Sequence, residues 1–176
     1  MLKKILLGLL AIIAIILIVA AFQPNTYHVE RSADVAAPPE AVYAHVVDFH
    51  NWSQFNPFQQ LDPNAKTRFD GPENGEGAKF FWAGNSEMGK GSMTIAKCTP
   101  NERVDILLHF DEPMAGDAET AFILKPNGTG THVTWSMDGK NNFMGKVMCM
   151  FMDMDGMIGG QYEKGLAKLG ELPATH

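Results

Sequence analysis

Apolar side chains recur at three- and four-residue steps near the end of the chain, from Asn142 to Leu169. This spacing places them on one face of a helix, so the segment is expected to form one long amphipathic helix. Its apolar stripe consists of Val147, Phe151, Met154, Ile158, Tyr162, Leu166 and Leu169. The rest of the fold is expected to be arranged around this helix.

The same segment is rich in methionine and glycine. Flexible, polarisable methionine side chains suit a surface that adapts to guests of different shape. Glycine lets another group approach the backbone, although each one inside a helix costs about 1 kcal/mol relative to alanine. We therefore interpret this helix as one wall of an apolar cavity; the alternative is an ordinary core in which methionine fills gaps. The methionines are at positions 144, 148, 150, 152, 154 and 157, and the glycines at 156, 159, 160 and 165.

A different pattern, alternation of apolar and polar residues, occupies most of the chain before this helix and predicts short strands. Strands separated only by turns are antiparallel neighbours, and one apolar face requires a covering helix. Asn127-Gly128-Thr129-Gly130 is typical of a hairpin turn. The expected strands are residues 27–35, 66–69, 78–83, 91–98, 103–110, 119–124 and 131–137.

Two helical segments are expected after the first strand. The first starts around Pro38-Pro39-Glu40, because proline is tolerated in a first helical turn and glutamate complements the positive end of the helix dipole. The second, within residues 51–63, is expected to be a short helix followed by a loop, and its Trp52, Phe55 and Phe58 must cover something apolar. Helices on one side of an antiparallel sheet of six to seven strands define an α+β fold.

The first residues form a separate module. Lys3 and Lys4 precede an uninterrupted apolar run, residues 5–22, which reaches the lower length limit of a transmembrane helix. We expect residues 1–23 to be a retained single-pass anchor and residues 27–170 to be the folded domain. The lysines favour a cytoplasmic amino terminus, which places the domain on the periplasmic or outer side of the inner membrane. The alternative is a cleaved signal peptide, because Val19-Ala20-Ala21 offers small residues before Phe22.

Composition narrows the possible partners and chemistry. The 176 residues are 45% hydrophobic and 19% charged, with a net charge of −6, which fits one folded domain and a short appendage. No lysine or arginine cluster follows Lys4, so nucleic acid is not expected as a partner. Cys98 and Cys149 stand too far apart for a metal motif; they are expected to be buried thiols, or a disulfide in an oxidising compartment.

Catalytic signatures were not found among the remaining residues. The sequence has no HExxH or GxSxG motif and no phosphate-binding glycine loop before a helix. His28, His109 and His132 fall at strand positions expected to face solvent. We therefore expect no catalytic residue, no metal ligand and no cofactor, while leaving the question of an enzymatic activity open.

Several stretches in the expected order resemble the START-like superfamily, also called SRPBCC or polyketide cyclase/dehydrase-like. They are VERSADVAAPPEAVYAHVVDFHNW, WSQFNPF, GSMTIAKCTPNERVDILLHF, THVTWSMDG and the closing YEKGLAKL, and the resemblance covers about residues 27–169. It implies a helix-grip fold, in which a curved antiparallel sheet surrounds a long carboxy-terminal helix. The superfamily includes lipid carriers, hormone receptors, aromatic cyclases and quinone-binding proteins, so the fold alone does not assign a function.

Three functions follow as hypotheses. The first is binding of a hydrophobic small molecule or lipid between the sheet and the last helix by an exported, membrane-tethered domain. The second is a cyclase- or dehydratase-type enzyme, which requires at least two titratable groups that converge in the cavity. The third is a surface-interaction domain without a ligand. For the first, the expected lining is Trp52, Phe55, Phe80, Trp82, Met93, Ile95, Leu108, Phe110, Phe122, Trp135, Met150, Met154 and Met157.

Overall fold

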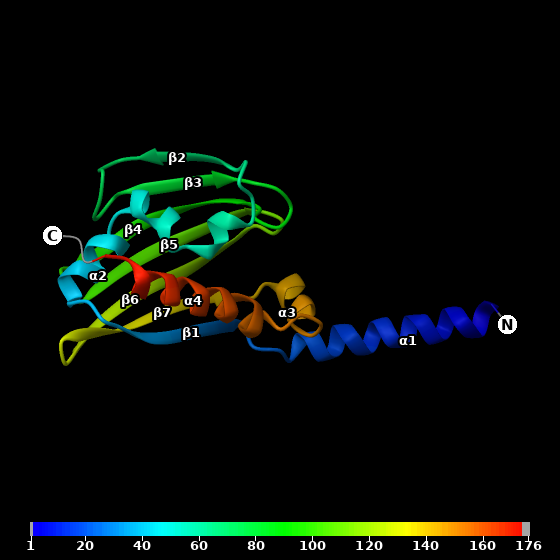
Figure 1. Cartoon of the computed structure of the whole chain (residues 1–176). Helices are drawn as coiled ribbons and strands as arrows, with labels where there is room; N and C mark the ends of the chain where they lie inside the picture. Colours follow the sequence, from blue (N-terminus) through cyan, green and yellow to red (C-terminus); the bar gives the residue numbers. More distant parts are fainter. Residues whose placement is uncertain (1, 174–176) are drawn as a thin grey trace.

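The computed structural model describes residues 2–173, so Met1 of the expected anchor lies outside it (Figure 1). The α-helices are α1 (Leu2–Ala21), α2 (Pro39–Val46), α3 (Phe143–Cys149) and α4 (Met154–Glu171), and the 3-10 helices are η1 (Phe49–Gln54) and η2 (Pro57–Gln60). The strands are β1 (Thr26–Val35), β2 (Lys66–Asp70), β3 (Lys79–Ala83), β4 (Lys90–Thr99), β5 (Arg103–Glu112), β6 (Gly116–Asn127) and β7 (Gly130–Lys140).

The strands form one seven-stranded antiparallel sheet in the order β1-β7-β6-β5-β4-β3-β2. From β2 to β7 each strand pairs with the next one in the sequence, because only turns connect them. The hairpin turn predicted at Asn127–Gly130 is present, and Gly128 in it has a φ of 62°. β1 comes from the start of the domain and pairs with β7, with Tyr27 opposite Gly139. The predicted α+β helix-grip architecture is confirmed.

α4 is held against β1 by an ionic contact. Arg31 of β1 lies 2.7 Å from a carboxylate oxygen of Asp155 and 2.8 Å from one of Glu163, both on α4. A Cβ atom on Gly159 would collide with the Arg31 guanidinium, so glycine at this position lets the arginine cross the helix surface. The carboxy-terminal half of α4 then buries Tyr162, Leu166 and Leu169 against the sheet.

An aromatic cluster fills one end of the space between the sheet and α4, which we call the closed end. Trp52 and Phe55 from η1 and its C-cap are completely buried with Phe122 of β6. The ring of Trp135 stacks on Phe122 with centroids 4.6 Å apart. The Trp52 indole N–H donates to the Val46 carbonyl oxygen at 3.0 Å, which fixes η1 to the end of α2. These side chains fill the space between the sheet and α4 at this end.

The expected single helix over residues 142–169 is wrong, because the structure divides it into α3 and α4. The Asn142 side chain caps α3 by accepting a hydrogen bond from the Gly145 N–H at 2.8 Å. The Asp153 side chain does the same for α4, accepting from the Gly156 N–H at 2.9 Å. Capping residues satisfy the free N–H groups at helix starts, so Asp153 favours a new helix over a continuous one.

The two cysteines are free thiols. Cys98 lies at the end of β4 and hydrogen bonds with Tyr43 of α2. The Cys149 thiol at the end of α3 is 3.8 Å from the side-chain oxygen of Asn141, just beyond β7. These positions are at opposite ends of the sheet, so the structure corrects the suggested disulfide.

α1 projects away from the domain (Figure 1). Most of its apolar side chains are exposed. Residues Lys3–Ala21 are long and apolar enough to cross a membrane. Ala20 differs from the rest of the helix because it is completely buried, and the end of α1 contacts α3. The apolar helix is therefore in contact with the domain at only one end.

We expect two alanine substitutions in α4 to have opposite effects on stability. A Cβ atom on Gly165 would lie 2.7 Å from the Trp135 ring and 3.1 Å from Pro57, whereas one on Gly160 meets no atom within 4 Å. Gly165→Ala should lower the free energy of unfolding by about 1–3 kcal/mol through overpacking. Gly160→Ala should raise it by up to about 1 kcal/mol through helix propensity.

The measurement is urea unfolding of the full chain in detergent micelles, followed by tryptophan fluorescence. Equal effects of the two variants would contradict the described packing of α4.

Candidate functional site

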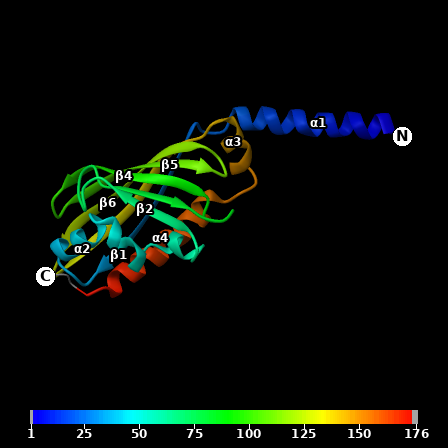
Figure 2. The ribbon, with the colours of Figure 1, turned by 90° about the horizontal axis from the view of Figure 1, so that it is seen from above.

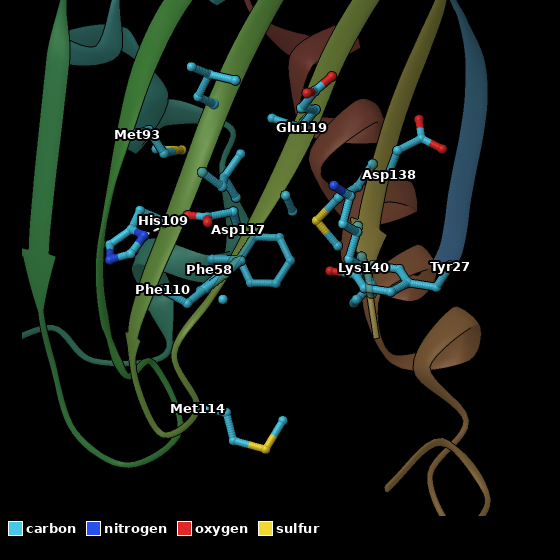
Figure 3. Close-up of a pocket in the computed structure, with 18 of the residues that line it drawn as sticks. Tyr27, Phe58, Met93, His109, Phe110, Met114, Asp117, Glu119, Asp138 and Lys140 are labelled. Atoms are coloured by element: carbon cyan, nitrogen blue, oxygen red, sulfur yellow. Dashed lines mark hydrogen bonds and ion pairs between the residues drawn. The ribbon is translucent and has the colours of Figure 1, made fainter. Parts of the chain in front are cut away.

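A cavity of about 1370 Å³ lies between the sheet, α3 and α4 (Figure 3). Its opening is at the end of the sheet opposite the closed end, and we call this opening the mouth. The mouth is bordered by the β3–β4 turn with Met88, the β5–β6 turn with Met114, the start of β1 with Tyr27, and α3. The same end of the domain carries α1 (Figure 1).

Most of the cavity wall is apolar, and methionines reach it from both the sheet and the helices. Of the residues expected to line it, the structure brings eight to the wall. Their strand positions alternate toward the concave face, as the sequence pattern predicted. These eight are Trp52, Phe80, Trp82, Met93, Leu108, Phe110, Trp135 and Met154. Contact of any of them with a ligand stays a prediction.

Five expected lining residues lie elsewhere. Phe55, Ile95 and Phe122 are completely buried within the core, because the aromatic cluster fills the closed end. Met150 lies in the break between α3 and α4, outside the cavity wall. Met157 is 56% exposed, because α4 starts anew at Met154 and turns this position to solvent. These five side chains are therefore not part of the cavity wall.

Other lining residues were not expected from the sequence. Met88 and Met114 lie in turns, where a single sequence carries no periodic signal. Tyr27 lies at the mouth because β1 pairs with β7, and this pairing has no local signal in one sequence. Phe58 was expected to cover something apolar, and it packs edge-on against Tyr162 with centroids 6.3 Å apart.

A buried polar cluster in the cavity is centred on Thr120 of β6. The Thr120 hydroxyl donates to the Ser136 carbonyl oxygen at 2.6 Å and accepts from the Trp135 indole N–H at 3.1 Å. The Tyr162 hydroxyl is 3.5 Å from the same Thr120 oxygen. This is longer than a normal O–H···O hydrogen bond, so the Tyr162 hydroxyl is only weakly engaged. The Tyr162 hydroxyl is therefore free to form a further hydrogen bond with a molecule in the cavity.

Both tyrosines of the cavity are neutral at physiological pH. Burial raises the pKa of Tyr162, which is 3% exposed and stacks on Trp135 at 4.1 Å. Burial also raises the pKa of Tyr27 at the mouth. A phenol with a raised pKa donates a hydrogen bond but does not accept a proton. The two groups therefore provide hydrogen-bond donors and no general base.

Histidine–aspartate pairs occupy the outer face of the sheet. His28 is 2.8 Å from Asp138 across β1 and β7, and His109 is 2.6 Å from Asp117 across β5 and β6. Strand alternation directs these side chains away from the concave face, although both pairs border the mouth. Among the described residues, no group of histidine, cysteine and carboxylate side chains is arranged to hold a metal ion.

Residues 26–172 match the family described as polyketide cyclase / dehydrase and lipid transport. The chain belongs to this family. The resemblance to the START-like superfamily noted from the sequence is thereby confirmed, and the match begins at β1 and ends just after α4. No curated protein matches the sequence.

Solved structures with the same fold are distant in sequence. Protein CV1439 from Chromobacterium violaceum is 19% identical, with a TM-score of 0.60, and the match covers 88% of this chain and 100% of that one. Protein MLL2253 from Mesorhizobium loti is 15% identical, with a TM-score of 0.59 and coverage of 84% and 99%. The Aha1 dimer from Colwellia psychrerythraea is 15% identical, with a TM-score of 0.58 and coverage of 82% and 94%. At these identities the likeness shows the fold alone.

The outer histidines generate a prediction about pH. Hydrogen bonds to Asp138 and Asp117 raise the pKa of His28 and of His109 above the usual value. A protonated histidine paired with aspartate stabilises the fold, and this stabilisation is complete below about pH 6.5, where the histidine is protonated in the unfolded chain too. The stabilisation is lost as the pH rises through the pKa of the histidine in the folded state. The thermal midpoint should therefore fall less between pH 6 and 8 in the His28→Gln/His109→Gln variant than in the unmodified chain.

The measurement is thermal unfolding across this pH range, with Lys125→Gln as an exposed-strand control. Identical pH dependence in all three proteins would rule out a contribution from these pairs.

Proposed function

We propose that this chain is a membrane-tethered protein that holds one hydrophobic small molecule or lipid in its cavity. The observation that carries the proposal is the apolar cavity of about 1370 Å³ with its mouth at the end of the domain that carries α1. Pockets for drug-sized ligands are about 300–1,000 Å³, so this one has room for a lipid-sized guest. The description of the family includes lipid transport, which agrees with such a guest.

The lining suggests what kind of molecule fits. Methionines at Met88, Met93 and Met114 adapt their shape, so they suit a flexible chain better than a rigid ring system. The Tyr162 hydroxyl offers a hydrogen-bond donor at depth. Among the described lining residues Lys140, exposed at the end of β7, is the one lysine or arginine, so a negative charge placed deep in the cavity would be unpaired. The favoured guest is an apolar chain with a neutral carbonyl or hydroxyl oxygen.

The tether is part of the proposal. α1 is retained as a single-pass anchor, with Lys3 and Lys4 on the cytoplasmic side and the domain on the periplasmic or outer side. The spacer between α1 and β1 is only residues 22–25, so the domain stays close to the bilayer. Such a position gives the cavity direct access to hydrophobic molecules in the membrane.

The two other hypotheses have less support. A cyclase or dehydratase needs a group that takes a proton inside the cavity. Tyr27 and Tyr162 stay protonated because burial raises the pKa of each, and the His28 and His109 side chains that border the mouth point to the outer face of the sheet. A surface-interaction domain without a ligand predicts a collapsed interior, which does not fit an open cavity of this size. Binding is therefore the function that the site supports best.

The first experiment fills the cavity. Leu108 lies on its wall, so Leu108→Trp should occupy space that the guest needs. Lys125→Trp adds the same side chain at an exposed strand position and serves as the control. Native mass spectrometry of the full chain, released from detergent micelles, should show a co-purified lipid-sized adduct on the unmodified chain and on Lys125→Trp, reduced at least fivefold on Leu108→Trp.

The same spectra test the tether, because an intact mass of 19.3 kDa means that α1 is retained. An adduct that is absent from all three proteins, or equally abundant in all three, would overturn the binding proposal.

The second experiment removes the Tyr162 hydroxyl. Losing one hydrogen bond should weaken binding of methyl palmitate, which has an ester carbonyl, by about fivefold, corresponding to about 1 kcal/mol. Binding of hexadecane, which has no oxygen, should not change in Tyr162→Phe. Both are measured by displacement of N-phenyl-1-naphthylamine, read through energy transfer from the cavity tryptophans. Equal loss of both ligands would show that the substitution damages packing rather than a specific contact.

A further inference from the structure

α3 has two different faces. One face forms part of the cavity wall through Gly145, Met148 and Cys149. The other presents Phe143 and Met144 to solvent, with exposed fractions of 48% and 59%. The helix thus lies between the cavity and the outside, and Phe143 and Met144 make part of its outer side apolar.

The exposed apolar surface continues into the break before α4. Phe151 is 70% exposed and Met152 is 36% exposed. Large apolar side chains gathered on a surface mark a contact with another molecule or with a membrane. Together with Phe143 and Met144 they form what we call the α3 patch.

The position of α1 indicates that the α3 patch lies against the bilayer. α1 has 20 residues, so it is about 30 Å long at about 1.5 Å per residue, which is the thickness of the hydrocarbon core of a bilayer. All of α1 is needed to cross, so its carboxy-terminal end lies at the membrane surface. That end lies beside α3 (Figures 1 and 2). Ala20 near this end is buried. The α3 patch therefore lies at the same surface.

The charges around the patch agree with a lipid contact. The chain has a net charge of −6, yet residues 139–152 contain no aspartate or glutamate. Lys140 and Lys146 are the charged residues of this stretch. Apolar and aromatic side chains bordered by lysine are typical of elements that lie in the interface of a bilayer.

We propose that the α3 patch inserts into the bilayer interface beside α1, so that the mouth of the cavity opens onto lipid. The insertion itself needs only the retained α1; its role in guest entry rests on the proposed function. With its outer face in lipid and its inner face on the cavity, α3 is the wall that a hydrophobic molecule passes when it moves from the membrane into the protein.

The test places a fluorescent reporter in the α3 patch. Phe143→Trp and Phe151→Trp are introduced separately into the full chain, which is reconstituted in phosphatidylcholine vesicles with brominated acyl chains. Phe69→Trp is the matched control, because Phe69 is 41% exposed on β2, the opposite edge of the sheet from β1. Emission from Trp52, Trp82 and Trp135 is subtracted using the unmodified chain in the same vesicles.

The emission added at positions 143 and 151 should be quenched at least twofold, more strongly by bromines near the headgroup than by bromines near the chain end. The emission added at position 69 should be unchanged. Equal emission at all three positions in brominated and unbrominated vesicles overturns the proposed insertion.

The result is independent of the mass-spectrometric test. An adduct on the unmodified chain without quenching at positions 143 and 151 overturns the insertion and leaves the binding function in place. Quenching at these positions without an adduct supports the insertion and removes the binding function.

Discussion

The aromatic side chains of η1 fill only one end of the space under α4, and the cavity exists because of this uneven filling. Trp52 and Phe55 are completely buried at the closed end and pack on Phe122 and Trp135. Protein interiors are packed as densely as crystals, so this end is rigid. A rigid end holds the sheet and α4 apart at a fixed distance. The other end can then stay open without loss of the fold.

α4 is held over the open end by two kinds of contact. From Tyr162 onward it is held by packing, with Tyr162, Leu166 and Leu169 buried. Arg31 adds ion pairs with Asp155 in the first turn and with Glu163 in the middle of the helix. Ionic contacts need less buried area than apolar packing, so a helix can be held beside a cavity in this way. The open cavity is thus compatible with a fixed helix wall.

The fold was largely predictable from local patterns, whereas the site was predictable only in part. Strand alternation placed Phe80, Met93 and Leu108 on the concave face, because the pleat repeats every two residues. The break between α3 and α4 was not predicted from the sequence. The apolar spacing continues across this break, whereas the hydrogen bond by which Asp153 caps the start of α4 favours a new helix. The Thr120–Tyr162 pair joins residues 42 positions apart, and such proximity has no local signal in one sequence.

The pairing of β1 with β7 has a consequence for how the chain acquires its structure. Thr26 faces Lys140 across this ladder, so the first strand of the domain has no partner until almost the whole domain has been synthesised. Contacts between segments far apart in sequence form slowly, and unpaired strand edges are prone to aggregate. A chain that is synthesised in order must therefore keep its first strand apart from its neighbours until the last one arrives, and helpers that shield nascent strands become relevant to its biogenesis.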